Sequence, residues 1–288
     1  MSYLCSDKTT VDYCIREEPA SFYQVLYNIL STDCKEYNLN SFKHFYIIAK
    51  IPLYNNKICQ ENITLINNKI KSCDTELLGR ILKGLKEEEL GHGETNSFNC
   101  QCSVFPITKY KINTCSHITY NMVHLIVALK QNIDVKNYEN ILEFGGGYGS
   151  MAKLCSDMGF KNKYFIYDLP GIKSIQEFYL NKLNVNNKII NDIDELKTID
   201  ITNKKNLFIA TWSLSEVDFD IREQIVDIIK DFDAVIIIFQ HNIWNRDNFK
   251  YFYESGKFQK KFTKISNWVL QNIPHIKWDG GNYYLIGN

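Results

Sequence analysis

An apolar run that ends in an acid and breaks into a glycine turn constrains this chain more than any other feature. Residues 141–149 are Ile-Leu-Glu-Phe-Gly-Gly-Gly-Tyr-Gly, with a carboxylate at Glu143 and glycine at Gly145, Gly147 and Gly149. Glycine removes the side chain where the backbone turns sharply or where a ligand approaches it closely. The pattern is typical of a parallel strand followed by a loop that binds a nucleotide-like ligand.

The spacing of the glycines indicates the kind of ligand. A dinucleotide-binding turn, G-x-G-x-x-G, would require glycine or alanine at position 150, where the chain has Ser150. The segment has the form E-x-G-x-G-x-G and resembles the first motif of the class I S-adenosylmethionine (SAM) dependent methyltransferases. The resemblance implies that Glu143, Gly145, Gly147 and Gly149 belong to a SAM site. A nicotinamide oxidoreductase is a weaker alternative.

A second apolar run ends at Asp168 and Leu169, and Asp168 lies 25 residues after Glu143. This distance accommodates a loop, a helix of about three turns and a second strand. We expect Asp168 to lie beside the glycine turn and to accept hydrogen bonds from ribose hydroxyls, because an ionised carboxylate offers only acceptors. We place Leu169 in the same cofactor site. The alternative for Asp168 is a helix N-cap, since Pro170 follows.

Further segments indicate which group of methyltransferases the chain resembles. The glycine motif, the Tyr-Asp-Leu-Pro ending at 167–170, Gln-Glu-Phe-Tyr-Leu at 176–180 and Ala-Thr-Trp-Ser-Leu-Ser-Glu at 210–216 together resemble the sugar O-methyltransferases of bacterial polysaccharide gene clusters. The resemblance runs from about residue 110 to the C-terminus. It implies SAM as cofactor, S-adenosylhomocysteine as product, and a Rossmann-like class I methyltransferase fold. That α/β fold has a mostly parallel sheet with an antiparallel C-terminal strand and helices on both faces.

Periodicity along the chain predicts two parts. Residues 1–112 form a helical N-terminal extension that contributes to the acceptor site, with helical spacing over 19–92 and a loop at 93–112. Residues 113–288 form the SAM-binding domain, which opens with a helix. Apolar runs then alternate with helical patterns, as expected for a parallel sheet. The expected strands are 140–144, 163–168, 187–190, 206–211 and 234–240, followed by two more within 261–288.

Bulk properties exclude several classes of protein. The 288 residues carry a formal net charge of +0, so no net field favours nucleic acid or an anionic membrane. No apolar stretch approaches the roughly 20 residues of a membrane span, and the N-terminus lacks the apolar core of a signal peptide, which predicts a cytoplasmic protein. The nine cysteines are an odd number without C-x-x-C, and we expect free thiols. The spacing of Cys100, Cys102, Cys115 and His117 matches no common zinc module.

Ligands of open parallel sheets bind beyond the carboxyl ends of the strands. After the third strand, we expect Asp192 and Ile193 to hold the adenine, with a solvated loop acid as an equal alternative for Asp192. After the fourth strand, Thr211, Trp212 and Ser213 lie where the sulfonium faces the acceptor; core packing is the alternative for Trp212. This segment lacks the Asn- or Asp-Pro-Pro-aromatic sequence of adenine and cytosine amino-methyltransferases, which argues against base methylation.

The fifth strand supplies the candidate general base. His241 follows this buried strand directly, and an imidazole can remove the proton of an alkyl hydroxyl as the methyl group transfers. Glu216 is the second catalytic candidate, as a hydrogen-bond acceptor for a sugar hydroxyl, with a helix cap as the equal alternative. Tyr120, on a helix face with His117 and His124, could close over the cofactor; for His124 we prefer core packing.

The sequence thus predicts a SAM-dependent O-methyltransferase that acts on a sugar hydroxyl of a nucleotide-linked or glycan precursor. Two alternatives stay open, namely O-methylation of another small hydroxylated metabolite and a non-catalytic SAM-binding regulatory module. A divalent metal near Glu216, Asp218 and Asp220 is left open and no metal ligand is assigned. The sequence does not decide whether the chain forms a homo-oligomer.

Overall fold

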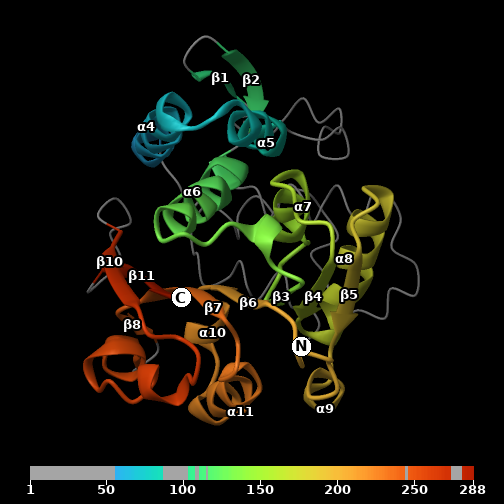
Figure 1. Cartoon of the computed structure of the whole chain (residues 1–288), viewed down its shortest axis with the longest axis vertical. Coiled ribbons are helices and arrows are strands. Elements are labelled where there is room, and N and C mark those ends of the chain that lie inside the picture. The colour runs from blue at the N-terminus through green and yellow to red at the C-terminus, as the bar shows by residue number, and fades with distance from the viewer. Residues whose placement is uncertain (1–55, 87–102, 108–109, 115, 244–245, 274–280) are drawn as a thin grey trace, which may run out of the picture.

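The computed structural model describes residues 56–86, 103–107, 110–114, 116–243, 246–273 and 281–288 (Figure 1). Its helices of eight or more residues are α4 (Asn56–Ser72), α5 (Thr75–Leu85), α6 (Ser116–Lys130), α7 (Ser150–Asp157), α8 (Pro170–Lys182) and α11 (Phe219–Ile229). The short helices are α9 (Ile193–Leu196), α10 (Ser213–Glu216), η2 (Val135–Asn137), η3 (Lys250–Glu254) and η4 (Gln259–Lys261).

A seven-stranded sheet forms the centre of the described structure. Its strands are β3 (Asn140–Phe144), β4 (Lys163–Tyr167), β5 (Asn187–Ile190), β6 (Asn206–Thr211), β7 (Ala234–Gln240), β10 (Trp268–Asn272) and β11 (Asn282–Gly287). They lie in the order β10-β11-β7-β6-β3-β4-β5. The pairs from β7 to β5 are parallel, whereas β11 runs antiparallel to both β7 and β10. This is the Rossmann-like class I methyltransferase fold, and it confirms the predicted fold class.

Each face of the sheet buries its own apolar core. In β7, Ile236 and Ile238 join the core beneath α6, α7 and α8, while Val235 and Ile237 join the core beneath α9, α10 and α11. Successive side chains of a strand point to opposite faces, so a strand between two helix layers is apolar throughout. All seven residues of β7 are buried accordingly. Figure 1 shows the two helix layers on either side of the sheet.

The predicted loop at 93–112 is wrong over its second half. Residues 103–107 and 110–114 pair as the antiparallel strands β1 (Ser103–Ile107) and β2 (Tyr110–Thr114). The hairpin contains Pro106, which lacks a backbone donor and is tolerated in a two-stranded ribbon because each strand has an unpaired edge. Ile112 packs against the core, and this contact explains why so short a hairpin forms. Residues 1–55 and 87–102, the rest of the predicted extension, lie outside the described residues.

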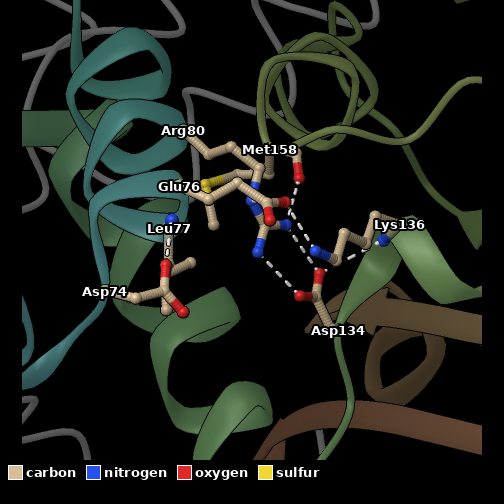
Figure 2. A network of polar contacts seen from close by, with 7 residues as sticks. All are labelled: Asp74, Glu76, Leu77, Arg80, Asp134, Lys136 and Met158. Carbon is tan, nitrogen blue, oxygen red and sulfur yellow. Dashed lines mark hydrogen bonds and ion pairs between the residues drawn. The ribbon is translucent and has the colours of Figure 1, made fainter.

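Helix α5 attaches the described part of the extension to the sheet domain. Its apolar stripe buries Ile81 and Leu85 fully. On its polar side, Arg80 donates two hydrogen bonds to Asp134, at 2.9 and 2.8 Å, and one to the carbonyl of Met158, at 2.6 Å (Figure 2). The side chains of Arg80 and Asp134 are 13% and 16% exposed, so water screens this ion pair only weakly.

We expect Arg80→Ala to lower the free energy of unfolding by about 1–3 kcal/mol, because it leaves the half-buried Asp134 and the Met158 carbonyl without their donor. Urea denaturation measures this loss. Lys136→Ala is the control, since Lys136 pairs with a Glu76 side chain that is 68% exposed, and should cost less than about 1 kcal/mol. Equal losses in the two variants would contradict the role given to Arg80.

Candidate functional site

The glycine turn after β3 needs its glycines for different reasons. Gly145, Gly147 and Gly149 have φ of 76°, 56° and 101°, in the region that favours glycine. A Cβ at Gly145 would lie 2.3 Å from the Cβ of Ser213, and a Cβ at Gly149 would lie 3.0 Å from the Leu180 side chain. At Gly147 a Cβ would meet no described heavy atom within 4 Å. The turn is therefore packed at Gly145 and Gly149 and open at Gly147, where a ligand can approach the backbone.

Asp168 lies beside this turn, as the sequence predicted. Its carboxylate accepts hydrogen bonds from the backbone N–H of Leu169 at 2.8 Å and from the Gln176 amide at 2.8 Å. Burial raises the pKa of Asp168 to about 6, while these donors and the N–H groups of Gly147 and Gly146 act to lower it. The N-cap of α8 is Leu169, so Asp168 does not occupy the N-cap position considered as its alternative.

Gln176 is a site residue that the sequence reasoning did not assign. It is fully buried, and its Nε2 donates to the carbonyl of Gly147 at 2.9 Å and to Asp168 Oδ2 at 2.8 Å. Its Oε1 is buried without a hydrogen-bond partner among the residues that the structure describes. One signal was present in the sequence: Gln176 interrupts the apolar stripe formed by Ile172 and Tyr179 at i−4 and i+3.

Glu143 lies beneath the turn. It is 1% exposed, and Tyr164 donates to it from the hydroxyl at 3.0 Å. Burial raises the pKa of Glu143 from its ordinary 4.5 to about 8; the Tyr164 hydrogen bond opposes this rise and the Asp168 charge adds to it. A Cβ at Gly146 would lie 3.2 Å from Glu143 Oε2, so the carboxyl group supports the turn from below.

The other predicted cofactor residues occupy three different environments. Asp192 is exposed and caps α9, accepting from the N–H of Asp194 at 2.8 Å. Ile193 packs against the core on that face. Leu169, next to Asp168, is 64% exposed.

The segment after β6 contacts the turn on its other side. Thr211 ends β6, and Ser213 donates from its hydroxyl to the carbonyl of Phe144. Between them Trp212 has φ of 65°, a strained value for a bulky residue that costs of order 1–3 kcal/mol. The Trp212 ring stacks on the buried Tyr120 ring at 5.2 Å and 7°, and its Nε1 donates to Asn282 at 3.2 Å. Trp212 is thus held by aromatic and polar contacts rather than by the core alone.

His241 directly follows β7, and Glu216 lies in the segment that follows the neighbouring strand β6. The His241 ring is parallel to that of Phe249, with centroids 4.8 Å apart, and its Nδ1 is 3.5 Å from the Tyr283 hydroxyl. Glu216 ends α10, and its Oε1 lies 3.4 Å from the Nε2 of Gln240, the residue before His241. Gln240 therefore links the two candidates, which the structure places at the same edge of the sheet.

No metal cluster occurs in the described part of the chain: it contains no group of three or more His, Cys, Asp or Glu residues that could hold an ion. Asp218, one of the acids considered near Glu216, forms an ion pair with Arg246. Cys100, Cys102 and Cys115 lie outside the described residues. No helix in the described ranges is long and apolar enough to cross a bilayer.

Comparisons with known proteins found similarity only to solved structures. No family model and no curated protein matches the chain. Solved methyltransferase structures resemble it, including a SAM dependent methyltransferase from Aquifex aeolicus (14% identity, 57% of this chain, 90% of that chain, TM-score 0.41). A second is an rRNA methylase from Streptococcus thermophilus (12% identity, 56% of this chain, 95% of that chain, TM-score 0.41). A third is an O-methyltransferase family protein from Burkholderia thailandensis (11% identity, 59% of this chain, 58% of that chain, TM-score 0.38). Likeness of this degree concerns the fold and not the acceptor.

We expect Glu143→Gln to make stability less dependent on pH. The folded state holds the Glu143 proton more tightly than the unfolded chain, so the wild type loses stability as pH rises from about 4.5 to about 8. The Gln variant has no proton to lose and can still accept from Tyr164. As pH rises across this window, the unfolding free energy of the variant should therefore increase relative to that of the wild type, by roughly 1.4 kcal/mol per unit of pKa shift. Above the window the difference between the two free energies should stay constant. Parallel stability curves, from urea titrations at several pH values, would contradict this assignment.

Proposed function

We propose that the chain is a SAM-dependent O-methyltransferase whose acceptor is a hydroxyl group of a sugar, in a nucleotide-linked or glycan precursor of a surface polysaccharide. The observation that carries the proposal is the convergence of an open turn at Gly147, the Asp168 carboxylate and the buried Gln176 amide at one edge of the sheet. Each of these groups suits one part of an adenosyl ligand.

The residues of this edge fit SAM on three counts. The space at Gly147 admits a ligand to the backbone. Asp168 can accept from ribose hydroxyls once these replace some of its present donors, among them the Leu169 N–H and the Gln176 amide. The exposed Leu169 can cover an adenine ring. When bound, SAM supplies an electrophilic methyl group, and the residues of this edge bind and orient it.

The acceptor side is formed by the segments after β6 and β7. Trp212 presents an aromatic surface held by Tyr120 and Asn282, which suits packing against a sugar ring. His241 Nε2 would take the proton of the acceptor hydroxyl, and Glu216 would accept a hydrogen bond from a second hydroxyl. The choice of a sugar as the acceptor is supported by the resemblance of three segments, 167–170, 176–180 and 210–216, to the sugar O-methyltransferases. We further propose that the extension, residues 1–112, completes the acceptor site.

We expect calorimetry to show binding of SAM and S-adenosylhomocysteine, and Asp168→Ala to weaken both by about tenfold to a hundredfold, because ribose hydroxyls lose their acceptor. Gly147→Val should weaken them further by filling the open space. Gly256→Val is the matched control, since Gly256 also has positive φ (62°) and a Cβ there would meet no described atom within 4 Å. Unchanged affinity in Asp168→Ala and Gly147→Val would refute the cofactor site.

Gln176→Leu should weaken SAM binding by about tenfold, since it removes the amide that joins Gly147 to Asp168. Asn181→Leu, at an exposed position of the same helix, is the control and should bind normally. If both variants bind SAM equally well, Gln176 has no part in the cofactor site.

His241→Ala should keep its SAM affinity and lose about two to four orders of magnitude in kcat. Near-full turnover would make His241 structural, and Glu216→Gln would then be the variant to measure.

A panel of nucleotide sugars and other hydroxylated metabolites, incubated with SAM and examined by mass spectrometry, tests the acceptor class. A sugar that gains the mass of one methylene group supports the proposal, and a methylated non-sugar metabolite moves the chain to the alternative substrate class. SAM that binds without any release of S-adenosylhomocysteine would favour a non-catalytic binding module.

A further inference from the structure

Arg222 on α11 is fully buried, and its hydrogen-bond partners are neutral. Its Nε donates to the carbonyl of Val217 at 2.9 Å, its Nη2 to the carbonyl of Ser215 at 2.6 Å, and its Nη1 to the side-chain oxygen of Asn248 at 2.8 Å. The guanidinium lies over the ring of Phe219, with its centroid 4.8 Å away. Burial lowers the pKa of Arg222 to about 10.

A buried arginine of this kind is a poor way to gain stability. Removing a guanidinium from water costs several kcal/mol, and a well-packed apolar side chain of similar volume often stabilises a fold as much or more. The planar guanidinium instead fixes the positions of several hydrogen-bond acceptors at the same time, because its N–H groups point at defined angles. The acceptors of Arg222 come from two separate segments, one after β6 and one after β7.

Asn248 connects Arg222 to the backbone of Gln240 and of the candidate catalytic residue His241. It is fully buried; its Nδ2 donates to the carbonyl of Gln240 at 3.0 Å and its backbone N–H to the carbonyl of His241 at 2.9 Å. The Gln240 side chain accepts from the Ser215 hydroxyl at 2.5 Å and approaches Glu216 at 3.4 Å. Arg222, Asn248, Gln240 and Ser215 thus form a closed ring of buried hydrogen bonds around the ends of β6 and β7.

We propose that Arg222 and Asn248 are positioning residues that hold His241 and Glu216 as one rigid unit at the acceptor edge. This inference rests on the proposed function of His241 and Glu216. The ring acts on them through the backbone at Ser215, Val217, Gln240 and His241, so neither Arg222 nor Asn248 contacts the substrate. The alternative is that the ring stabilises the fold without affecting the placement of His241.

Asn248→Asp separates the two roles. The aspartate keeps an acceptor for Arg222 and adds an opposite charge, so the variant should remain folded with a melting temperature near that of the wild type. It loses the donor to the Gln240 carbonyl. Arg222→Lys keeps the positive charge but replaces the planar guanidinium, so it cannot reach all three acceptors at once. Ser215→Ala is a milder change, because it removes only the hydroxyl group from the ring. The control is Ile229→Ala, which creates a cavity in the apolar core beneath the same helix, seven residues after Arg222.

The readout is the proton NMR spectrum of the His241 ring, identified by the signals missing from His241→Gln. In the wild type the parallel Phe249 ring should shift these signals upfield. In Asn248→Asp and Arg222→Lys they should move toward the values of an exposed histidine, and in Ser215→Ala part of the way. Ile229→Ala should lower the melting temperature and leave them in place. On an acceptor found by the panel, kcat should fall about tenfold to a hundredfold in the first two variants, with KM for SAM unchanged.

His241 signals that stay at the wild-type position in both folded variants would overturn the proposal. Signals that move equally in Ile229→Ala would also overturn it, because the effect would then belong to core stability in general. Binding of S-adenosylhomocysteine is measured alongside: its absence in the wild type would refute the proposed function, while the NMR result would still decide whether the ring positions His241.

Discussion

The missing side chain at Gly145 is the constraint on which both halves of the candidate site depend. Ser213 packs so closely there that even a methyl group would overlap it, with a Cβ-to-Cβ distance of 2.3 Å. The Ser213 hydroxyl also donates to the carbonyl of Phe144, next to Gly145. Because β3 and β6 are neighbours in the sheet, this contact joins the segment after β3 to the segment after β6. A larger residue at 145 would separate the proposed cofactor side from the acceptor side.

The sheet could be predicted almost residue by residue from the sequence. Strands β3, β5, β6 and β7 have the predicted bounds, and β4 ends one residue earlier. This accuracy has a physical origin: strands buried on both faces require uninterrupted apolar runs, and the glycine turn and the acid endings mark where those runs stop. The antiparallel pair β10 and β11 was also placed correctly within its range, because the class of fold fixes where its last strands lie.

Features that depend on contacts distant in sequence could not be predicted. The hairpin of β1 and β2 contains a proline and many polar residues, so its sequence resembles a loop until Ile112 meets the core. Gln176 acquires its importance only when α8 places it between Gly147 and Asp168. Glu143 could be assigned to the cofactor site from its position after an apolar run, but the burial that raises its pKa to about 8 depends on the folded surroundings. In each case contacts between segments distant in sequence, rather than the local pattern, determined the structure or the chemistry.

The distribution of buried polar groups shows where this fold accepts a cost in stability. Polar side chains are buried at both ends of the sheet. At the amino ends of β3 and β6 these are Asn140 and Asn206, and the edge that follows the carboxyl ends of β3, β6 and β7 buries a larger set, among them Gln176, Ser215, Gln240, Asn248 and Asn282. Polar groups buried in a low dielectric are expensive unless they are hydrogen-bonded, and when bonded into networks they hold backbones rigidly. Asn282 belongs to this edge because β11 runs antiparallel and begins where β7 ends. The network at the carboxyl ends thus holds together the segments where a transferred group and its acceptor would have to be aligned, and the apolar layers on both faces of the sheet supply the hydrophobic stabilisation.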